Sequence, residues 1–141
     1  GEAPSDMDER LDLRFPGLFT LLGFDMNGKT FEPGERIDMT FYYRVTGETD
    51  RNLFFYVDIE GPDGYRVPPH FHAHHYPLNG RYRTDDWKTG EILRDPVEIV
   101  IPENIRHPVE LDITLQILHR RRPQAFADGR KKIHLADIRV K

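Results

Sequence analysis

The sequence has no cysteine and a single serine, Ser5. Without cysteine the chain can form neither a disulfide bond nor a thiolate metal site, and a cysteine nucleophile is excluded. The serine lies in an acidic stretch outside any Gly-x-Ser-x-Gly motif, which effectively excludes a serine nucleophile. Glycine-rich phosphate-binding motifs are also missing. No set of residues indicates catalysis, and we predict that the chain is not an enzyme.

Long apolar runs are absent as well. No stretch approaches the roughly 20 apolar residues that a membrane-spanning helix requires, and no signal-peptide pattern opens the sequence. Lys and Arg number 20 against 24 Asp and Glu, which gives a net charge of −4. A protein of this charge has no overall attraction to nucleic acid. We therefore expect neither a membrane span nor a nucleic-acid partner for these 141 residues.

The residues that are present favour β-structure. Nine Phe, six Tyr and one Trp suit strands better than helices. Apolar and polar residues alternate clearly along 37–45 and 109–117, which is the pattern of half-buried strands. Similar patterns predict strands at 18–26, 53–59, 97–101 and 132–140, with a short one at 65–67. The apolar phase changes at Leu135-Ala136, which predicts a β-bulge there.

Turn signals separate these segments, including Asn27-Gly28 and Asn79-Gly80. Short strands joined by turns predict an all-β fold, namely an antiparallel β-sandwich of about seven to nine strands, Ig-like or jelly-roll. We assign residues 15–141 to this single domain. The acidic residues 1–14 are expected to form a flexible N-terminal segment.

The segment 67–77 is the part of the sequence richest in side chains that could have a chemical function, since it contains four of the seven histidines. On an extended strand His70, His72 and His74 would share one face, and successive members would lie roughly 7 Å apart. Imidazole is a common ligand of zinc, copper and nickel. One hypothesis is therefore a transition-metal site formed by these three residues. His70 and His74 would be roughly 13 Å apart on a straight strand, so the chain must bend or take a third ligand from His119 or His134.

The alternative for the same segment is structural. The histidines would then form a polar surface strip or stack on Phe71 and Tyr76. No further cofactor is indicated.

Two other groups of residues are candidates for ligand contact. Tyr76, Tyr82 and Trp87 combine a large ring with a polar group, a combination suited to binding surfaces; Trp87 could equally anchor the core. The loop 120–132 carries six cations around Phe126, among them Arg121 and Arg122, and could meet an anionic partner. The alternative for this loop is a solvated surface that discourages edge-to-edge aggregation.

Several short motifs lie along the chain, namely Pro33-Gly34-Glu35, Phe54-Phe55-Tyr56-Val57, Pro62-Asp63-Gly64, Trp87-Lys88-Thr89-Gly90-Glu91, Arg94-Asp95-Pro96 and Ile99-Val100-Ile101-Pro102. Together they resemble motifs of β-sandwich domains found at the ends of bacterial membrane glycosyltransferases and related exported proteins. The resemblance spans residues 33–118, although the histidine run departs from it. It implies an extracytoplasmic, non-catalytic accessory module of a larger membrane-associated assembly.

Taken together, these features predict a binding or interaction module that recognises a partner protein or a glycan through a sandwich face or its end loops. A metal-binding β-domain and a purely structural spacer are the alternatives that the sequence leaves open.

Overall fold

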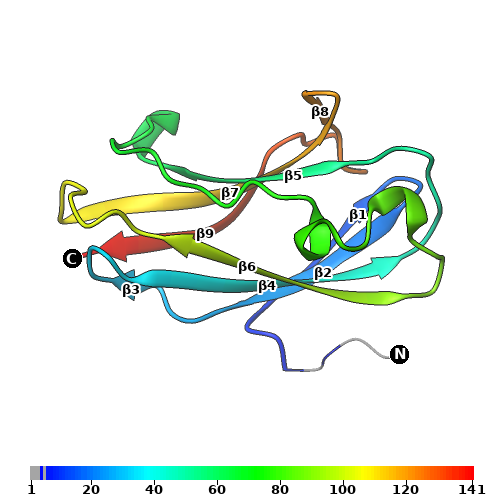
Figure 1. Cartoon of the computed structure of the whole chain (residues 1–141), viewed down its shortest axis with the longest axis horizontal. Helices are drawn as coiled ribbons and strands as arrows, with labels where there is room; N and C mark the ends of the chain where they lie inside the picture. Colours follow the sequence, from blue (N-terminus) through cyan, green and yellow to red (C-terminus); the bar gives the residue numbers. More distant parts are fainter. Residues whose placement is uncertain (1–3, 5) are drawn as a thin grey trace.

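The computed structural model describes residue 4 and residues 6–141 of the chain. The described residues form nine strands in two sheets, which confirms the predicted β-sandwich (Figure 1). The strands are β1 (Glu9–Phe15), β2 (Phe19–Met26), β3 (Thr30–Phe31), β4 (Arg36–Val45), β5 (Phe54–Glu60), β6 (Ile92–Val100), β7 (Val109–His119), β8 (Arg122–Gln124) and β9 (Ile133–Val140).

The two sheets differ in strand order and size. Sheet A is fully antiparallel in the order β1-β2-β4-β6. Sheet B has the order β3-β9-β7-β5, with β3 parallel to β9, and the short β8 pairs with the end of β7. Strands β5 and β6 are therefore edge strands of different sheets, and the chain between them must pass from one sheet to the other, as the green segment does in Figure 1.

Side-chain alternation determines which face of each strand enters the core. Ile37, Met39 and Phe41 point inward from β4, and Ile113 and Leu115 point inward from β7; all five are almost completely buried. Aromatic side chains fill the space at one end of the sandwich. Their ring centroids lie 5.3 to 6.3 Å apart, in mostly edge-to-face pairs. These core rings belong to Phe19, Tyr43, Phe55 and Trp87.

The predicted bulge in the last strand is confirmed. Ile113 pairs with Ala136, whereas Thr114 pairs with His134, so Leu135 is the extra residue of β9. Leu135 and Ala136 are both buried. The bulge thus lets two consecutive apolar residues face the core, which explains the change of phase in the sequence.

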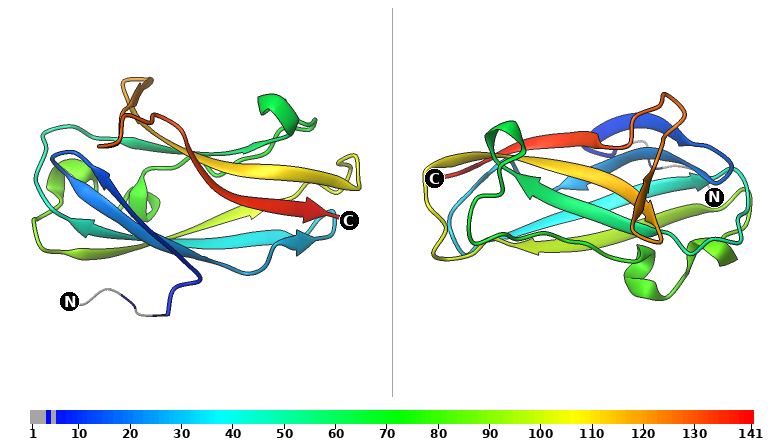
Figure 2. Two further views of the ribbon diagram at one scale, coloured as in Figure 1. Left: turned by 180° about the vertical axis from the view of Figure 1, so that it is seen from behind. Right: turned by 90° about the horizontal axis from the view of Figure 1, so that it is seen from above.

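The structure differs from the sequence-based expectation in several segments, including the short strands β3 and β8, which were not predicted. Residues 9–14 were assigned to a flexible segment, yet they form most of β1 at the edge of sheet A (Figure 2). Strand β6 begins at Ile92 rather than Val97, because Leu93 and Asp95 continue its inward face. No strand forms at 65–67; this part follows the 3₁₀ turn η1 (Pro62–Gly64).

The connector, residues 61–91 between β5 and β6, has two further 3₁₀ turns, η2 (Pro77–Gly80) and η3 (Thr84–Asp86). None of the helical segments in the described residues is long and apolar enough to cross a membrane.

Candidate functional site

The histidine-rich part of the connector lies along the edge of sheet B. The amide of Phe55 donates to the carbonyl of His75 at 2.8 Å, and the amide of His75 donates back to Phe55 at 2.9 Å. Ala73 donates to Val57 at 3.0 Å, and an isolated bridge joins His72 to Asp58. The connector therefore covers the free edge of β5 with an irregular strand-like segment, which protects that edge.

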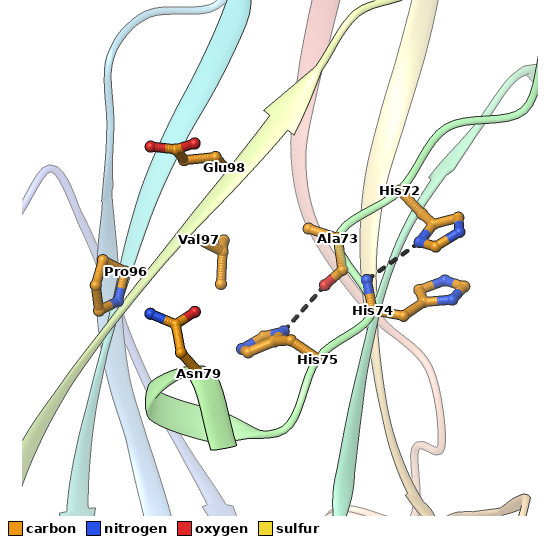
Figure 3. Close-up of a pocket in the computed structure, with 8 residues that line it drawn as sticks. All are labelled: His72, Ala73, His74, His75, Asn79, Pro96, Val97 and Glu98. Carbon is orange, nitrogen blue, oxygen red and sulfur yellow. Dashed lines mark hydrogen bonds between the residues drawn. The ribbon is translucent and has the colours of Figure 1, made fainter. Parts of the chain in front are cut away.

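Because this segment is extended, successive side chains point to opposite sides. Figure 3 shows the rings of His72 and His74 on one side of the connector, and Ala73 and His75 on the side that faces β6. The histidines are thus divided into two groups with different surroundings. The sequence predicted that His70, His72 and His74 share a face, and the rings of these three residues do contact one another.

Six rings form a continuous group on the outer face of sheet B, which we call the ring cluster. His74 stacks on Tyr56 with centroids 3.3 Å apart and on His72 at 3.7 Å. At one end Phe54 meets Tyr76 edge-to-face at 4.9 Å, and Tyr76 is 44% exposed. At the other end the His70 and His72 centroids are 5.4 Å apart. The ring cluster consists of Phe54, Tyr56, His70, His72, His74 and Tyr76.

A buried carboxylate, Asp58, lies beneath the His70 end of the ring cluster. Its Oδ1 atom is 2.6 Å from His70 Nε2 and also accepts the amide of Ile59 at 3.0 Å, while Oδ2 is 3.0 Å from Arg66 Nη2. Burial by itself would raise the pKa of Asp58, but the hydrogen bond from His70 and the charge of Arg66 together lower it. Asp58 is therefore an ionised carboxylate that is hydrogen-bonded to His70, to Arg66 and to the backbone amide of Ile59.

His74 is the most deeply placed imidazole of the ring cluster. Its side chain is only 11% exposed, and its Nε2 atom lies 3.8 Å from Asp58 Oδ1 without a hydrogen-bond partner in the described structure. Burial, followed by the nearby His72, lowers the pKa of His74 to about 4, despite the opposing effect of Asp58. Burial also lowers the pKa of His72. Both rings are consequently neutral at pH 7.

His75 has a different role, because both of its ring nitrogens are engaged. Nδ1 lies 2.9 Å from the carbonyl oxygen of Ala73, and Nε2 lies 2.7 Å from Asp95 Oδ2. Asp95 is fully buried and also accepts the hydroxyl of Tyr43 at 2.8 Å and the amide of Leu78 at 2.9 Å. This network fastens the connector to β6 and engages both ring nitrogens of His75 in hydrogen bonds within the protein.

A groove of about 560 Å³ runs between the connector and β6. Its lining is mixed, with imidazole, amide and carboxylate groups beside the apolar Pro96 and Val97 (Figure 3). The remaining lining residues are His72, Ala73, His74, His75, Asn79 and Glu98.

The structure places the other predicted contact residues apart from this site. Trp87 and Phe126 are 1% and 2% exposed and belong to the core, so neither presents its ring to a ligand. Tyr82 donates its hydroxyl to Glu91 at 2.6 Å, and this hydrogen bond raises the pKa of Tyr82 to about 12. For Trp87, the core-anchor alternative raised by the sequence agrees with its position.

Two of the six cations of the loop 120–132 are paired with carboxylates. Arg130 pairs with Asp128 at 2.8 Å, and Lys132 pairs with Glu60 at 2.6 Å. Arg121 and Arg122 are exposed beside the tight turn between β7 and β8.

The two histidines considered as a third metal ligand also lie elsewhere. His119 is at the end of β7, beside Arg122 of β8. His134 is on β9, 3.5 Å from Asp112 and 2.8 Å from Asp137. The sequence analysis did not identify Asp58 as part of the site; its buried position results from the connector folding back over β5.

No protein-family model matches this chain, and no curated protein matches it significantly.

Proposed function

We propose that this domain is a non-catalytic glycan-binding module, and that the ring cluster is its contact surface. The observation that carries the proposal is the continuity of six rings on one outer sandwich face, ending in the exposed Tyr76. Soluble proteins bury most large rings in the core, so rings gathered on the outside of a sheet favour a surface that meets a ligand.

The chemistry of this surface suits sugars. A pyranose ring offers an apolar face of C–H groups surrounded by hydroxyls, and aromatic rings with polar neighbours bind both features. Tyr76 and Phe54 supply apolar ring surface, and Arg66, His70 and His72 supply hydrogen-bonding groups from side chains that remain exposed. The resemblance to accessory domains of bacterial membrane glycosyltransferases favours a glycan over a protein partner, and it favours an extracytoplasmic location.

Binding of the full chain to immobilised neutral and acidic bacterial polysaccharides tests this proposal. We expect saturable binding by the wild-type chain, and at least about tenfold weaker binding by Tyr76→Ala, equivalent to about 1.4 kcal/mol. Tyr65→Ala is the matched control, because Tyr65 is 63% exposed and makes no ring contact with the cluster.

Intact folding of both variants is checked by the fluorescence of Trp87, which is buried in the core. Equal loss of binding in Tyr65→Ala, or no polysaccharide bound by the wild-type chain, would contradict the proposal. Capture of a protein partner through Tyr76 without any polysaccharide binding would replace the glycan by a protein ligand.

A further inference from the structure

We propose that the hairpin formed by β7 and β8 carries a binding site for a phosphate group. The site shares no residue with the ring cluster, and it does not depend on the proposed binding of a glycan. It is formed by Arg120 and Arg122 of the hairpin, with His119 beside them and Arg51 from the loop between β4 and β5. Figures 1 and 2 show the hairpin, in orange, rising from the outer side of sheet B.

The turn of this hairpin has arginine at positions where glycine or asparagine is favoured. His119 pairs with Arg122, so Arg120 and Arg121 are the two central residues of the turn. Both have positive φ angles, of 51° and 69°. Turns of this kind are usually formed by Asn-Gly and similar pairs, because a Cβ atom disfavours the left-handed conformation. Residues held in disfavoured conformations are frequent at ligand sites, so the two arginines favour a function at this tip.

A cavity of about 520 Å³ lies against the hairpin, and its lining suits an anion. Among the residues that the structure describes, the lining consists of His119, Arg120, Arg122 and Gln124, with no carboxylate to compete for the cations. Each guanidinium offers five N–H donors in a planar arrangement that matches the oxygens of a phosphate. The imidazole of His119 adds a further N–H donor. The cavity therefore combines positive charge with many hydrogen-bond donors.

Arg51 adds a third guanidinium from the neighbouring loop, and its position is fixed on both sides. Its Nη1 atom donates to the Oε1 atom of Gln124 at 3.3 Å. Its backbone carbonyl accepts a hydrogen bond of 2.7 Å from the hydroxyl of the fully buried Thr84. Gln124 in turn donates through Nε2 to the carbonyl of Arg122 at 2.8 Å. These contacts order part of the site before an anion binds, which lowers the entropic cost of binding.

The guanidinium groups of this site differ from several other arginines of the protein, because no carboxylate neutralises them. Arg66, Arg83 and Arg130 each lie 2.8 to 3.0 Å from an aspartate oxygen. In the described part of the chain, by contrast, no ion pair includes Arg51 or the three arginines at 120–122. On a protein whose net charge is −4, these neighbouring arginines create a local positive potential that attracts anions.

The number of donors favours a phosphate over a carboxylate. A carboxylate has two oxygens and one charge, and a single guanidinium can satisfy it in a bidentate pair. A phosphate group has three strong acceptor oxygens and a charge of about −1.5 to −2 at pH 7. Several guanidinium groups and an imidazole around one cavity correspond better to the phosphate. This group can be free inorganic phosphate or a phosphate carried by a glycan, and the experiments below separate the two sources.

Titration of the full chain with inorganic phosphate at low ionic strength, followed by backbone amide NMR shifts, tests the site. We expect saturable binding with a Kd of about 1 mM or lower, and at least about tenfold weaker binding of acetate. Arg120→Gln and Arg122→Gln should each weaken phosphate binding at least about tenfold, because each removes charged hydrogen bonds. Lys131→Gln is the matched control, since it removes one charge from the same loop without lining the cavity.

A second titration identifies the source of the phosphate. A phosphate-bearing polysaccharide is compared with the same polysaccharide after its phosphate groups have been removed. Tighter binding of the phosphorylated form by the wild-type chain, lost in Arg122→Gln, identifies a glycan as the carrier. Equal binding of both forms, together with saturable binding of inorganic phosphate, identifies free phosphate as the ligand.

The arginines at 120 and 122 are exposed, so their substitution should leave the fold intact, and Trp87 fluorescence verifies this. The proposal is overturned if the wild-type chain binds no inorganic phosphate, if acetate binds as tightly, or if Lys131→Gln weakens phosphate binding as much as Arg122→Gln does. Since the first titration contains no sugar, its failure is separate from failure of the glycan proposal.

Discussion

The depressed pKa of His74 makes the stability of this domain dependent on pH in a defined window. Burial lowers this pKa from 6.5 to about 4. Above pH 6.5 the ring is neutral in both the folded and unfolded chain, so the full stability is present. As the pH falls below 6.5, the unfolded chain takes up a proton that the folded chain does not, and the free energy of unfolding decreases until about pH 4.

The size of this effect follows from the shift. Each unit of pKa difference corresponds to about 1.4 kcal/mol, so the decrease between pH 7.5 and pH 4.5 is about 2.5 kcal/mol. The side chain of His74 is only 11% exposed, and solvent therefore reduces the effect little. His74→Phe keeps a ring against Tyr56 and removes the titrating group, so the variant should lose about 2.5 kcal/mol less than the wild-type chain over this range.

Urea unfolding at pH 7.5 and 4.5, followed by Trp87 fluorescence with a chelator present, measures the difference. Val100→Ala serves as the control, because Val100 is 61% exposed, lies outside the ring cluster and carries no titratable group. If the wild-type chain and His74→Phe lose the same stability between the two pH values, His74 is not a buried neutral imidazole and the description of the ring cluster is wrong.

Three further changes test how the fold is held together. Gly23→Ala should detach β1, because a Cβ atom there would lie directly against the carbonyl oxygen of Glu9; we expect a loss of about 2 kcal/mol and faster proteolysis within residues 7–15. Phe126→Ala should cost about 3–5 kcal/mol in urea unfolding, because its ring packs edge-on against Phe15 in the core. Tyr43→Phe should cost about 1–2 kcal/mol, because it removes one hydrogen bond to the buried carboxylate of Asp95; no change in stability would show that Asp95 is satisfied by His75 and Leu78 alone.

The parts of the fold that alternation describes well were predictable from sequence. Apolar and polar residues alternate along almost the whole length of β4 and β7, and the bulge at Leu135 was visible in the sequence as a change in the phase of the apolar residues. Strand β1 was missed because its inward residues, Leu11, Leu13 and Phe15, are separated by charged residues in a sequence with an acidic start. The charged residues concealed the alternation of buried and exposed side chains in β1. Edge strands commonly show this alternation, because only one of their faces is buried.

The site was predictable only in part, for a reason that concerns the connector. Alternation along β5 correctly places Tyr56 and Asp58 opposite to the inward Phe55 and Val57. It does not reveal that another segment will cover that face. The pairing of the connector with β5 rests on a few backbone hydrogen bonds in an irregular segment with no strand pattern of its own. The histidines were therefore visible as a motif, whereas their partner Asp58 was not.

The same pairing explains why neighbouring histidines of the connector have different surroundings. Along an extended segment parity decides the side, so His72 and His74 face the outer rings while His75 faces β6 and Asp95. The hydrogen bonds between His75 and Phe55 fix this register in both directions. A shift by one residue would bring His74 to Asp95 and remove its ring from Tyr56. The buried network of Tyr43, Asp95 and His75 thus supports the ring cluster indirectly, because it fixes which side chains of the connector face outward.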